Sequence, residues 1–244
     1  MTAGPMNRLV GREKLLVQLE REVLRGSTLM LLGPLGIGKS SILAALASRV
    51  RERNRPCGLA PDTRCLGDIT AALASAYPDI DASSLTQRRL RSCLRLAVEE
   101  RPGVLLLDHI STAGTATKGF LRSLRGTGLG VLLAADVENR RDHVATRALH
   151  LAYMETEVPP LARPTMAAIL DARLQRQALP HPLQEEDRRS LLLLAKGNPG
   201  RLVSFVDLLV DGRFWREGRV STSSVNGAAL ELVLRRYLAL DTCP

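Results

Sequence analysis

Residues 33–40 constrain the fold of this chain more than any other stretch. They read Gly-Pro-Leu-Gly-Ile-Gly-Lys-Ser, and they stand between an apolar run at residues 28–32 and a helical pattern at residues 40–53. Glycines in such a turn allow successive backbone N–H groups to face inward around an anion. A helix that begins near Lys39 adds its positive end. The sequence therefore predicts a strand, an anion-binding loop and a helix in direct succession.

This segment, which we call the phosphate loop, matches the complete pattern G-x-x-x-x-G-K-[ST]. Lys39 is expected to reach the β- and γ-phosphates of a nucleoside triphosphate, and the Ser40 hydroxyl to ligate magnesium. We therefore predict ATP with Mg²⁺ as the ligand. The residues expected to contact it are Gly33, Pro34, Leu35, Gly36, Ile37, Gly38, Lys39, Ser40 and Ser41.

A second candidate element is the apolar run at residues 104–107, which ends at Asp108. In a P-loop NTPase, an acid at the carboxyl end of such a strand holds magnesium directly or through water. The alternative is a strand followed by an aspartate that caps a helix. His109 follows, where many ATPases carry a glutamate that orients the attacking water. A histidine there could contact the γ-phosphate, accept a proton or merely end the strand, so the sequence leaves hydrolysis open.

Apolar runs of strand length alternate with helical patterns over the first two thirds of the chain. This alternation predicts an α/β fold, namely a three-layer αβα P-loop NTPase core with a parallel sheet. After Pro164 the patterns are helical, at residues 165–177, 185–195, 201–210 and 226–240. We therefore predict a core at residues 1–160, a small helical lid at 161–212 and a C-terminal helical tail at 213–244.

Composition limits the partners of the chain. The net charge is +9, and only four of the 34 basic residues are lysines. Such basicity indicates a polyanionic partner, although an arginine-rich bias is also typical of GC-rich genomes. Phe214 and Trp215, flanked by Arg213, Arg216 and Arg219, form either a nucleic-acid contact surface or an aromatic anchor that packs the tail on the lid. We favour the anchor.

No leader opens the chain, and no apolar run approaches the ~18 residues that span a bilayer. We therefore expect a cytoplasmic protein without membrane contact. The four cysteines form no close pair, and the four histidines are scattered, so we predict neither a disulfide nor a zinc site.

Three further segments resemble a known family. Leu9-Val10-Gly11-Arg12-Glu13 resembles the VGRE opening of AAA+ ATPases close to the STAND and origin-recognition groups. Gly197-Asn198-Pro199 resembles the GxP motif of STAND lids, and Val158-Pro159-Pro160-Leu161 is similar to the junction between core and lid. With the phosphate loop, the resemblance spans about residues 9–210.

The resemblance implies an αβα core with a helical lid, ATP held between them and nucleotide-dependent assembly. By position, Val10 and Gly11 would lie beside the adenine, and Pro199 would approach the base or ribose. Arg201 would sense the γ-phosphate, although it lies one place later than a G-x-x-R pattern puts this arginine. Arg147 would act in trans as an arginine finger. For both arginines the alternative is a solvated surface charge.

The sequence also departs from the family pattern. A small polar sensor residue should follow the strand at 131–136, where Ala134, Ala135 and Asp136 stand instead. Together with His109, this change favours slow turnover.

Three functions are consistent with these features. The first is an AAA+/STAND-like ATPase that acts as a nucleotide-dependent switch or assembly factor, with a homo-oligomer or a separately encoded protein as partner. The second is a DNA-associated helper ATPase of the transposition or replication-initiation type, for which nucleic acid would be the partner. The third is a non-hydrolysing ATP-binding regulatory module.

Overall fold

The computed structural model describes residues 9–61, 63, 65–109, 115–136 and 154–241, with side chains up to residue 232. By their internal contacts, two compact units are distinguished. The sheet unit comprises residues 1–34 and 39–158, and the helical unit comprises residues 35–38 and 159–244. The tip of the phosphate loop is thus grouped with the helical unit. The predicted division into core, lid and tail stays a prediction.

The sheet unit is built on five parallel strands in the order β2-β3-β4-β1-β5. The predicted parallel sheet between helices, and with it the α/β fold class, is confirmed. The strands are β1 (Thr28–Gly33), β2 (Cys57–Ala60), β3 (Val104–Leu107), β4 (Gly130–Asp136) and β5 (Met154–Glu157).

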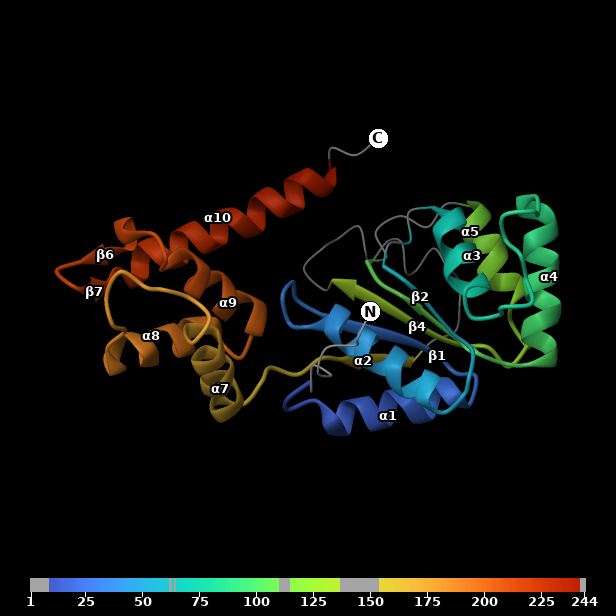
Figure 1. The fold of residues 1–244 in the computed structure, drawn as a ribbon, viewed down its shortest axis with the longest axis horizontal. Coiled ribbons are helices and arrows are strands. Elements are labelled where there is room, and N and C mark those ends of the chain that lie inside the picture. Colours follow the sequence, from blue (N-terminus) through green and yellow to red (C-terminus); the bar gives the residue numbers. More distant parts are fainter. Residues whose placement is uncertain (1–8, 62, 64, 110–114, 137–153, 242–244) are drawn as a thin grey trace. The chain divides into compact units, whose positions relative to one another are not determined.

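Helices cover both faces of this sheet, with α1 and α2 on one side and α3, α4 and α5 on the other (Figure 1). Met30 and Leu133 belong to the apolar cluster that includes α3, α4 and α5. Their neighbours Leu31 and Leu132 are equally buried, and because side chains alternate along a strand they face α1 and α2. Burial on both faces explains why these strands read as continuous apolar runs. The helices are α1 (Glu13–Leu24), α2 (Lys39–Glu52), α3 (Leu66–Ala74), α4 (Gln87–Glu100) and α5 (Thr115–Ser123).

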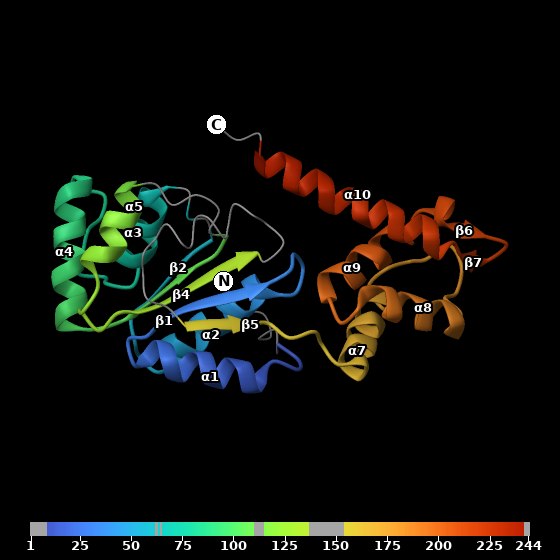
Figure 2. The ribbon, with the colours of Figure 1, turned by 180° about the vertical axis from the view of Figure 1, so that it is seen from behind.

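In the helical unit, α7, α8 and α9 pack together and α10 follows a short hairpin (Figure 2). Its core includes Leu170, Leu191 and Phe205. The elements are α7 (Arg163–Leu174), α8 (Glu185–Ala195), α9 (Pro199–Leu208), the 3₁₀ turn η1 (Gly212–Phe214), β6 (Trp215–Arg216), β7 (Arg219–Val220) and α10 (Thr222–Asp241).

The hairpin formed by β6 and β7 was not predicted from the sequence. Each strand has two residues, and the turn between them holds Glu217 and Gly218 at φ angles of 51° and 74°. A turn with two positive φ angles usually contains Asn-Gly or Asp-Gly. Glutamate is not typical of the first position, so the sequence did not indicate this turn. Among the described residues, no helix is long and apolar enough to cross a membrane.

Candidate phosphate-binding site

The carboxyl edge of the sheet brings the phosphate loop close to two buried carboxylates. β1 lies between β4 and β5, and Gly33 pairs in register with Asp136. Asp108 follows β3, on the far side of β4, and its N–H donates to Ala60 O at 2.9 Å. Neighbouring strands lie ~4.8 Å apart, so Asp108 stands about 10 Å from the strand that carries the loop. This spacing leaves room for a metal ion and a phosphate group.

Two glycines of the loop have positive φ angles, which an anion-binding turn uses. Gly36 and Gly38 have φ angles of 81° and 101°, in the region where an L side chain is strained. Lys39 begins α2 and is buried, and its Nζ donates to Gly33 O at 2.6 Å and to Pro34 O at 3.1 Å. The ammonium group is therefore held at the base of the loop, where phosphate oxygens can replace the two carbonyls. Ser40 and Ser41 are exposed in the first turn of α2.

Asp108 and His109 form a distorted strand end. His109 has a φ angle of 49°, and its N–H donates to Asp108 Oδ1 at 3.0 Å. Thr63 holds this conformation, because its hydroxyl donates to His109 O at 3.1 Å. The imidazole Nε2 lies 3.7 Å from Asp108 Oδ2, and the His109 side chain is 58% exposed. A non-glycine residue in this conformation costs about 1–3 kcal/mol and commonly marks a functional site.

The start of α9 is specified by the segment at residues 196–199. Lys196 and Gly197 both have positive φ angles and end α8. Asn198 caps α9, because its Oδ1 accepts from Arg201 N at 3.0 Å, and Pro199 occupies the first helical position. Gly197 O accepts from Leu161 N at 2.8 Å. The two segments that resemble the lid motif and the core–lid junction are therefore in direct contact.

The first turn of α9 also binds the tip of the phosphate loop. Asn198 Nδ2 donates to Leu35 O at 2.8 Å, and Gly200 N donates to Gly36 O at 2.9 Å. A Cβ on Gly200 would lie 2.6 Å from Gly36 Cα, and a Cβ on Gly36 would lie 2.9 Å from Asn198 Oδ1. Both glycines are therefore needed for the close approach of the two backbones.

Sequence reasoning did not assign Asn198 or Gly200 to the loop. The signal in the sequence was Gly200, a glycine in the first turn of a helix. Glycine within a helix destabilises it by about 1 kcal/mol relative to alanine, so its presence suggests that another segment packs closely against it. The asparagine before a proline was a second signal, but only for the helix cap.

The remaining predicted residues are less constrained. Val10 is exposed, and Gly11 has a φ angle of 78° in the turn before α1. Pro199 is half-buried, whereas Arg201 is exposed. Arg147 lies outside the described residues. The roles predicted for these five residues stay predictions.

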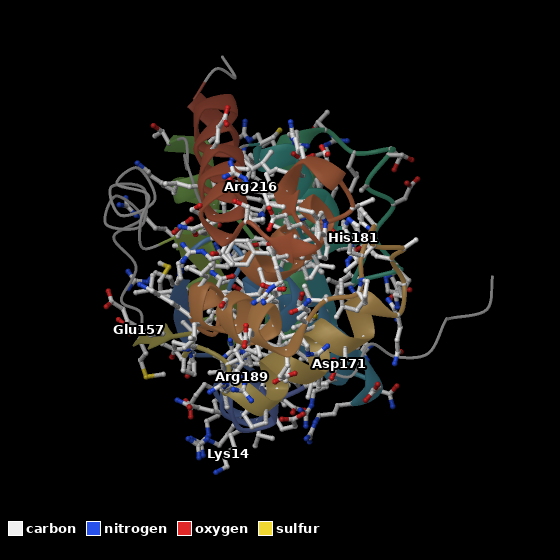
Figure 3. All side chains as sticks on the ribbon, turned by 90° about the vertical axis from the view of Figure 1, so that its left-hand side faces the viewer. Lys14, Glu157, Asp171, His181, Arg189 and Arg216 are labelled. Atoms are coloured by element: carbon white, nitrogen blue, oxygen red, sulfur yellow. The ribbon has the colours of Figure 1, made fainter. Side chains whose placement is uncertain are left out.

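The aromatic residues of the tail pack inside the helical unit. Phe214 and Trp215 are buried, and Trp215 Nε1 donates to Leu209 O at 2.8 Å. His181, labelled in Figure 3, packs edge-on against Trp215 with ring centroids 5.4 Å apart. The anchor interpretation is therefore confirmed.

Two of the three neighbouring arginines have acidic partners, whereas Arg216 is exposed. Arg213 pairs with Asp211 at 2.8 Å, and Arg219 pairs with Glu186 at 2.6 Å. Arg213 also lies over the Phe214 ring, 4.8 Å from its centroid. The alternative interpretation, a nucleic-acid contact surface, is disfavoured because Phe214 and Trp215 are buried.

The donor set fits a magnesium triphosphate better than a free metal ion. Among the residues that the structure describes, no cluster of three or more His, Cys, Asp or Glu side chains could hold a metal. Ser40 and Asp108 supply a hydroxyl and a carboxylate, and magnesium prefers such oxygens together with water and phosphate.

The sequence matches no protein-family model, and no curated protein is significantly similar to it. Solved structures share its fold. Domain III of the replication initiation protein DnaA from Thermotoga maritima is 17% identical with a TM-score of 0.51, and the match covers 87% of both chains. The Aeropyrum pernix ORC1 protein in complex with DNA is 19% identical with a TM-score of 0.53, covering 91% of this chain and 65% of that one.

The Hsp104-ADP complex of S. cerevisiae is 18% identical with a TM-score of 0.54, and the match covers 82% of this chain and 30% of Hsp104. The chain thus spans less than two thirds of the ORC1 and Hsp104 chains. At these identities the likeness shows a common fold.

The burial of Trp215, the only tryptophan, generates a prediction about its fluorescence. We expect blue-shifted emission that single-stranded oligonucleotides do not quench, because a buried indole cannot stack on bases. A fluorescence titration with oligo(dT) at low salt measures this. Urea unfolding in the same cuvette is the control, since it exposes the indole and must shift its emission. Quenching of the folded protein on addition of oligo(dT) would contradict the anchor.

Proposed function

We propose that this chain is an AAA+-like ATP-binding protein in which the phosphate loop, residues 33–40, acts as a nucleotide-dependent switch. One observation carries the proposal: the tip of the loop is hydrogen-bonded to the first turn of α9, whereas its base belongs to the sheet unit. A ligand that reorders the loop therefore acts on Asn198 and Gly200. Differential contact of this kind is what a ligand needs to shift a conformational equilibrium.

In the proposed complex, each residue has a separate task. Lys39 Nζ exchanges the carbonyls of Gly33 and Pro34 for phosphate oxygens. Ser40 and Asp108 hold Mg²⁺, which neutralises part of the triphosphate charge. The inward N–H groups of the loop bind the remaining phosphate oxygens.

The comparisons support an adenine nucleotide and leave the cellular task as a proposal. The structure of Hsp104 was determined as an ADP complex, and the ORC1 structure contains DNA. The fold shared with both is the fold that the sequence resemblance to AAA+ ATPases implies. For the DNA-associated alternative, the net charge of +9 remains as support, but the segment at residues 213–219 does not, because its aromatic residues are buried. We therefore favour the switch.

Substituting Lys39 by alanine tests the ligand. We expect Lys39→Ala to weaken Mg-ATP binding about a hundredfold or more, because it removes a charge-assisted contact to two phosphates. Isothermal titration calorimetry measures the affinity. The matched control is Lys14→Ala, which removes the same charge from an exposed position on α1 (Figure 3). Unchanged affinity in Lys39→Ala, with the control also unchanged, would remove the basis of the proposal.

Substituting Gly200 by alanine tests the coupling. The added Cβ would lie 2.6 Å from Gly36 Cα, so α9 and the loop tip must separate and lose the bond between Gly200 N and Gly36 O. We expect Mg-ATP affinity to fall about tenfold, the equivalent of roughly 1.4 kcal/mol.

Gly212→Ala is the control for this substitution, because a Cβ there meets nothing within 4 Å. Both variants should unfold at urea concentrations close to that of the wild type. Equal or tighter ATP binding in Gly200→Ala would show that the contact does not support the bound state.

We further propose that hydrolysis is slow and requires assembly. His109 replaces the usual glutamate beside Asp108, and Ala134 and Ala135 replace the polar sensor. A weak proton acceptor and a missing sensor lower the rate, and Arg147 of a second copy would supply the transition-state charge.

Steady-state phosphate release over a protein concentration series measures this. We expect turnover well below 1 per second, with a specific activity that rises with concentration and is lost in Arg147→Ala. A specific activity that is independent of concentration would exclude a finger in trans, and no release at any concentration would leave a non-hydrolysing module.

A further inference from the structure

A pocket of about 330 Å³ opens in the sheet unit at the edge opposite to the phosphate loop. Cys57 lines it and is the first residue of β2, whereas Gly33 and Asp108 stand at the carboxyl ends of their strands. All five strands are parallel, so this is the amino-terminal edge, from which the arrow of β4 points away in Figure 1. The volume lies at the lower end of the range for small-molecule sites.

Positive charge gathers in this pocket from three segments. The connection between α2 and β2 lines the pocket, and so do residues at the carboxyl ends of α3 and α4. The basic residues that line it are Arg51, Arg55 and Arg101.

Among the described residues, these three arginines have no acidic partner, unlike their neighbours Arg49 and Arg53. Arg49 and Arg53 both pair with the buried Glu20. Within the part of the chain that the structure describes, no ion pair involves any of the three arginines of the pocket. Arg51 and Arg101 are exposed and Arg55 is half-buried, so an anion in the pocket would meet three positive charges.

Backbone contacts hold two of the guanidinium groups in place. Arg51 Nη2 donates to Cys57 O at 3.1 Å, and Arg101 Nη2 donates to Asn54 O at 2.8 Å. Each bond uses one of the five N–H donors of a guanidinium group and fixes its position. The others stay available to a ligand.

Arg55 provides the independent observation. Its Nε is buried and has no hydrogen-bond partner among the residues that the structure describes. A buried donor without an acceptor costs about 1–3 kcal/mol and is uncommon in folded proteins. A bound oxyanion would supply the acceptor.

The hydroxyl of Tyr77 lies near two of these arginines and donates to Arg101 O at 2.9 Å. Burial raises the pKa of Tyr77 to about 12, and the positive charges of Arg101 and Arg55 oppose this rise. Both guanidinium groups therefore act on the same small region.

The charge balance of the pocket still favours an anion when the helix ends are included. Three helices direct their carboxyl ends here, and each carries about −0.5 of an elementary charge, so together they offset about half of the three arginine charges. The surplus of about +1.5 charges favours a compact ligand with two negative charges. Guanidinium forks match phosphate oxygens, because two parallel N–H groups bind two oxygens.

A small molecule fits this pocket better than a nucleic acid. Proteins that bind single strands combine a long basic groove with exposed aromatic residues on which bases stack. The residues that line the pocket include no aromatic side chain; those between the arginines include Pro56, Cys57 and Ala76.

We propose that this pocket is a second anion site, which binds the phosphate or diphosphate group of a small molecule through Arg51, Arg55 and Arg101. The site is separate from the phosphate loop and does not depend on the function proposed for that loop.

The probe is inorganic pyrophosphate. All measurements use the Lys39→Ala variant in EDTA as the background protein, so that the phosphate loop does not contribute to pyrophosphate binding. Calorimetry on this background should show one saturable site with a dissociation constant below about 1 mM. Adding Arg55→Gln should weaken binding at least tenfold, because a charged contact is lost, while unfolding in urea stays unchanged, because Arg55 Nε has no partner to lose.

The matched control is Arg88→Gln, which removes the same charge from an exposed position at the other end of α4. Adding Arg88→Gln to the Lys39→Ala protein should leave its affinity for pyrophosphate unchanged. Arg55→Lys, which keeps the charge without the fork, should show intermediate affinity and serves as the test if Arg55→Gln does not fold.

Three outcomes would overturn the proposal. The first is no pyrophosphate binding on the Lys39→Ala background, and the second is an equal loss in Arg88→Gln and Arg55→Gln. The third is binding of oligo(dT) that depends on Arg55 and that pyrophosphate does not displace. If Lys39→Ala still bound Mg-ATP like the wild type, the function proposed for the phosphate loop would be wrong. The proposal of a second anion site would still be decided by the effect of Arg55→Gln on pyrophosphate binding.

Discussion

The pairing of β1 with a strand on each side is the constraint on which the rest of this structure depends. β1 has β4 on one edge and β5 on the other, and its residues from Leu29 to Gly33 are buried. A strand with both edges paired and both faces covered cannot change register without exposing its apolar side chains. The point at which the chain leaves the sheet is therefore fixed at Gly33. Lys39 and Asp136 take their positions from that point, since one begins the next helix and the other pairs with Gly33.

Within the helical unit, the first turn of α9 is hydrogen-bonded to the tip of the same loop, residues 35–38. The cap of α9 uses both ends of one amide, with Asn198 Oδ1 on Arg201 N and Nδ2 on Leu35 O. A change at the loop tip therefore changes the cap of a helix whose body packs in the apolar core through Leu202 and Phe205. Packed cores favour discrete arrangements over continuous deformation, which is the behaviour that the proposed switch requires.

The sequence predicted the parts of this molecule that depend on local patterns. The apolar runs at residues 28–32, 104–107 and 131–136 predicted β1, β3 and β4, and the glycine spacing with Lys39 predicted the loop, because a buried parallel strand and an anion cradle each need a distinctive run of residues. β5 has no such run, because most of its side chains are exposed. Contacts between distant segments were not predictable. Asn198 and Leu35 are 163 positions apart, and Arg101 and Asn54 are 47 apart. In the sequence, Arg51, Arg55 and Arg101 look like any of the other arginines of a basic chain. Only the meeting of three helix ends at one edge of the sheet distinguishes them.

The carboxyl edge of the sheet also explains why metal and nucleotide should bind together in the proposed complex. Asp108 and Asp136 are buried on adjacent strands, and Asp108 Oδ1 is already occupied by the N–H of His109. With the Ser40 hydroxyl, the chain offers too few oxygens for the six ligands of magnesium, so phosphate and water must supply the rest. Two buried carboxylates would in turn repel a bare triphosphate at this edge. In the proposed complex, magnesium reduces the repulsion between the triphosphate and the carboxylates, and the triphosphate supplies oxygen ligands that the chain lacks.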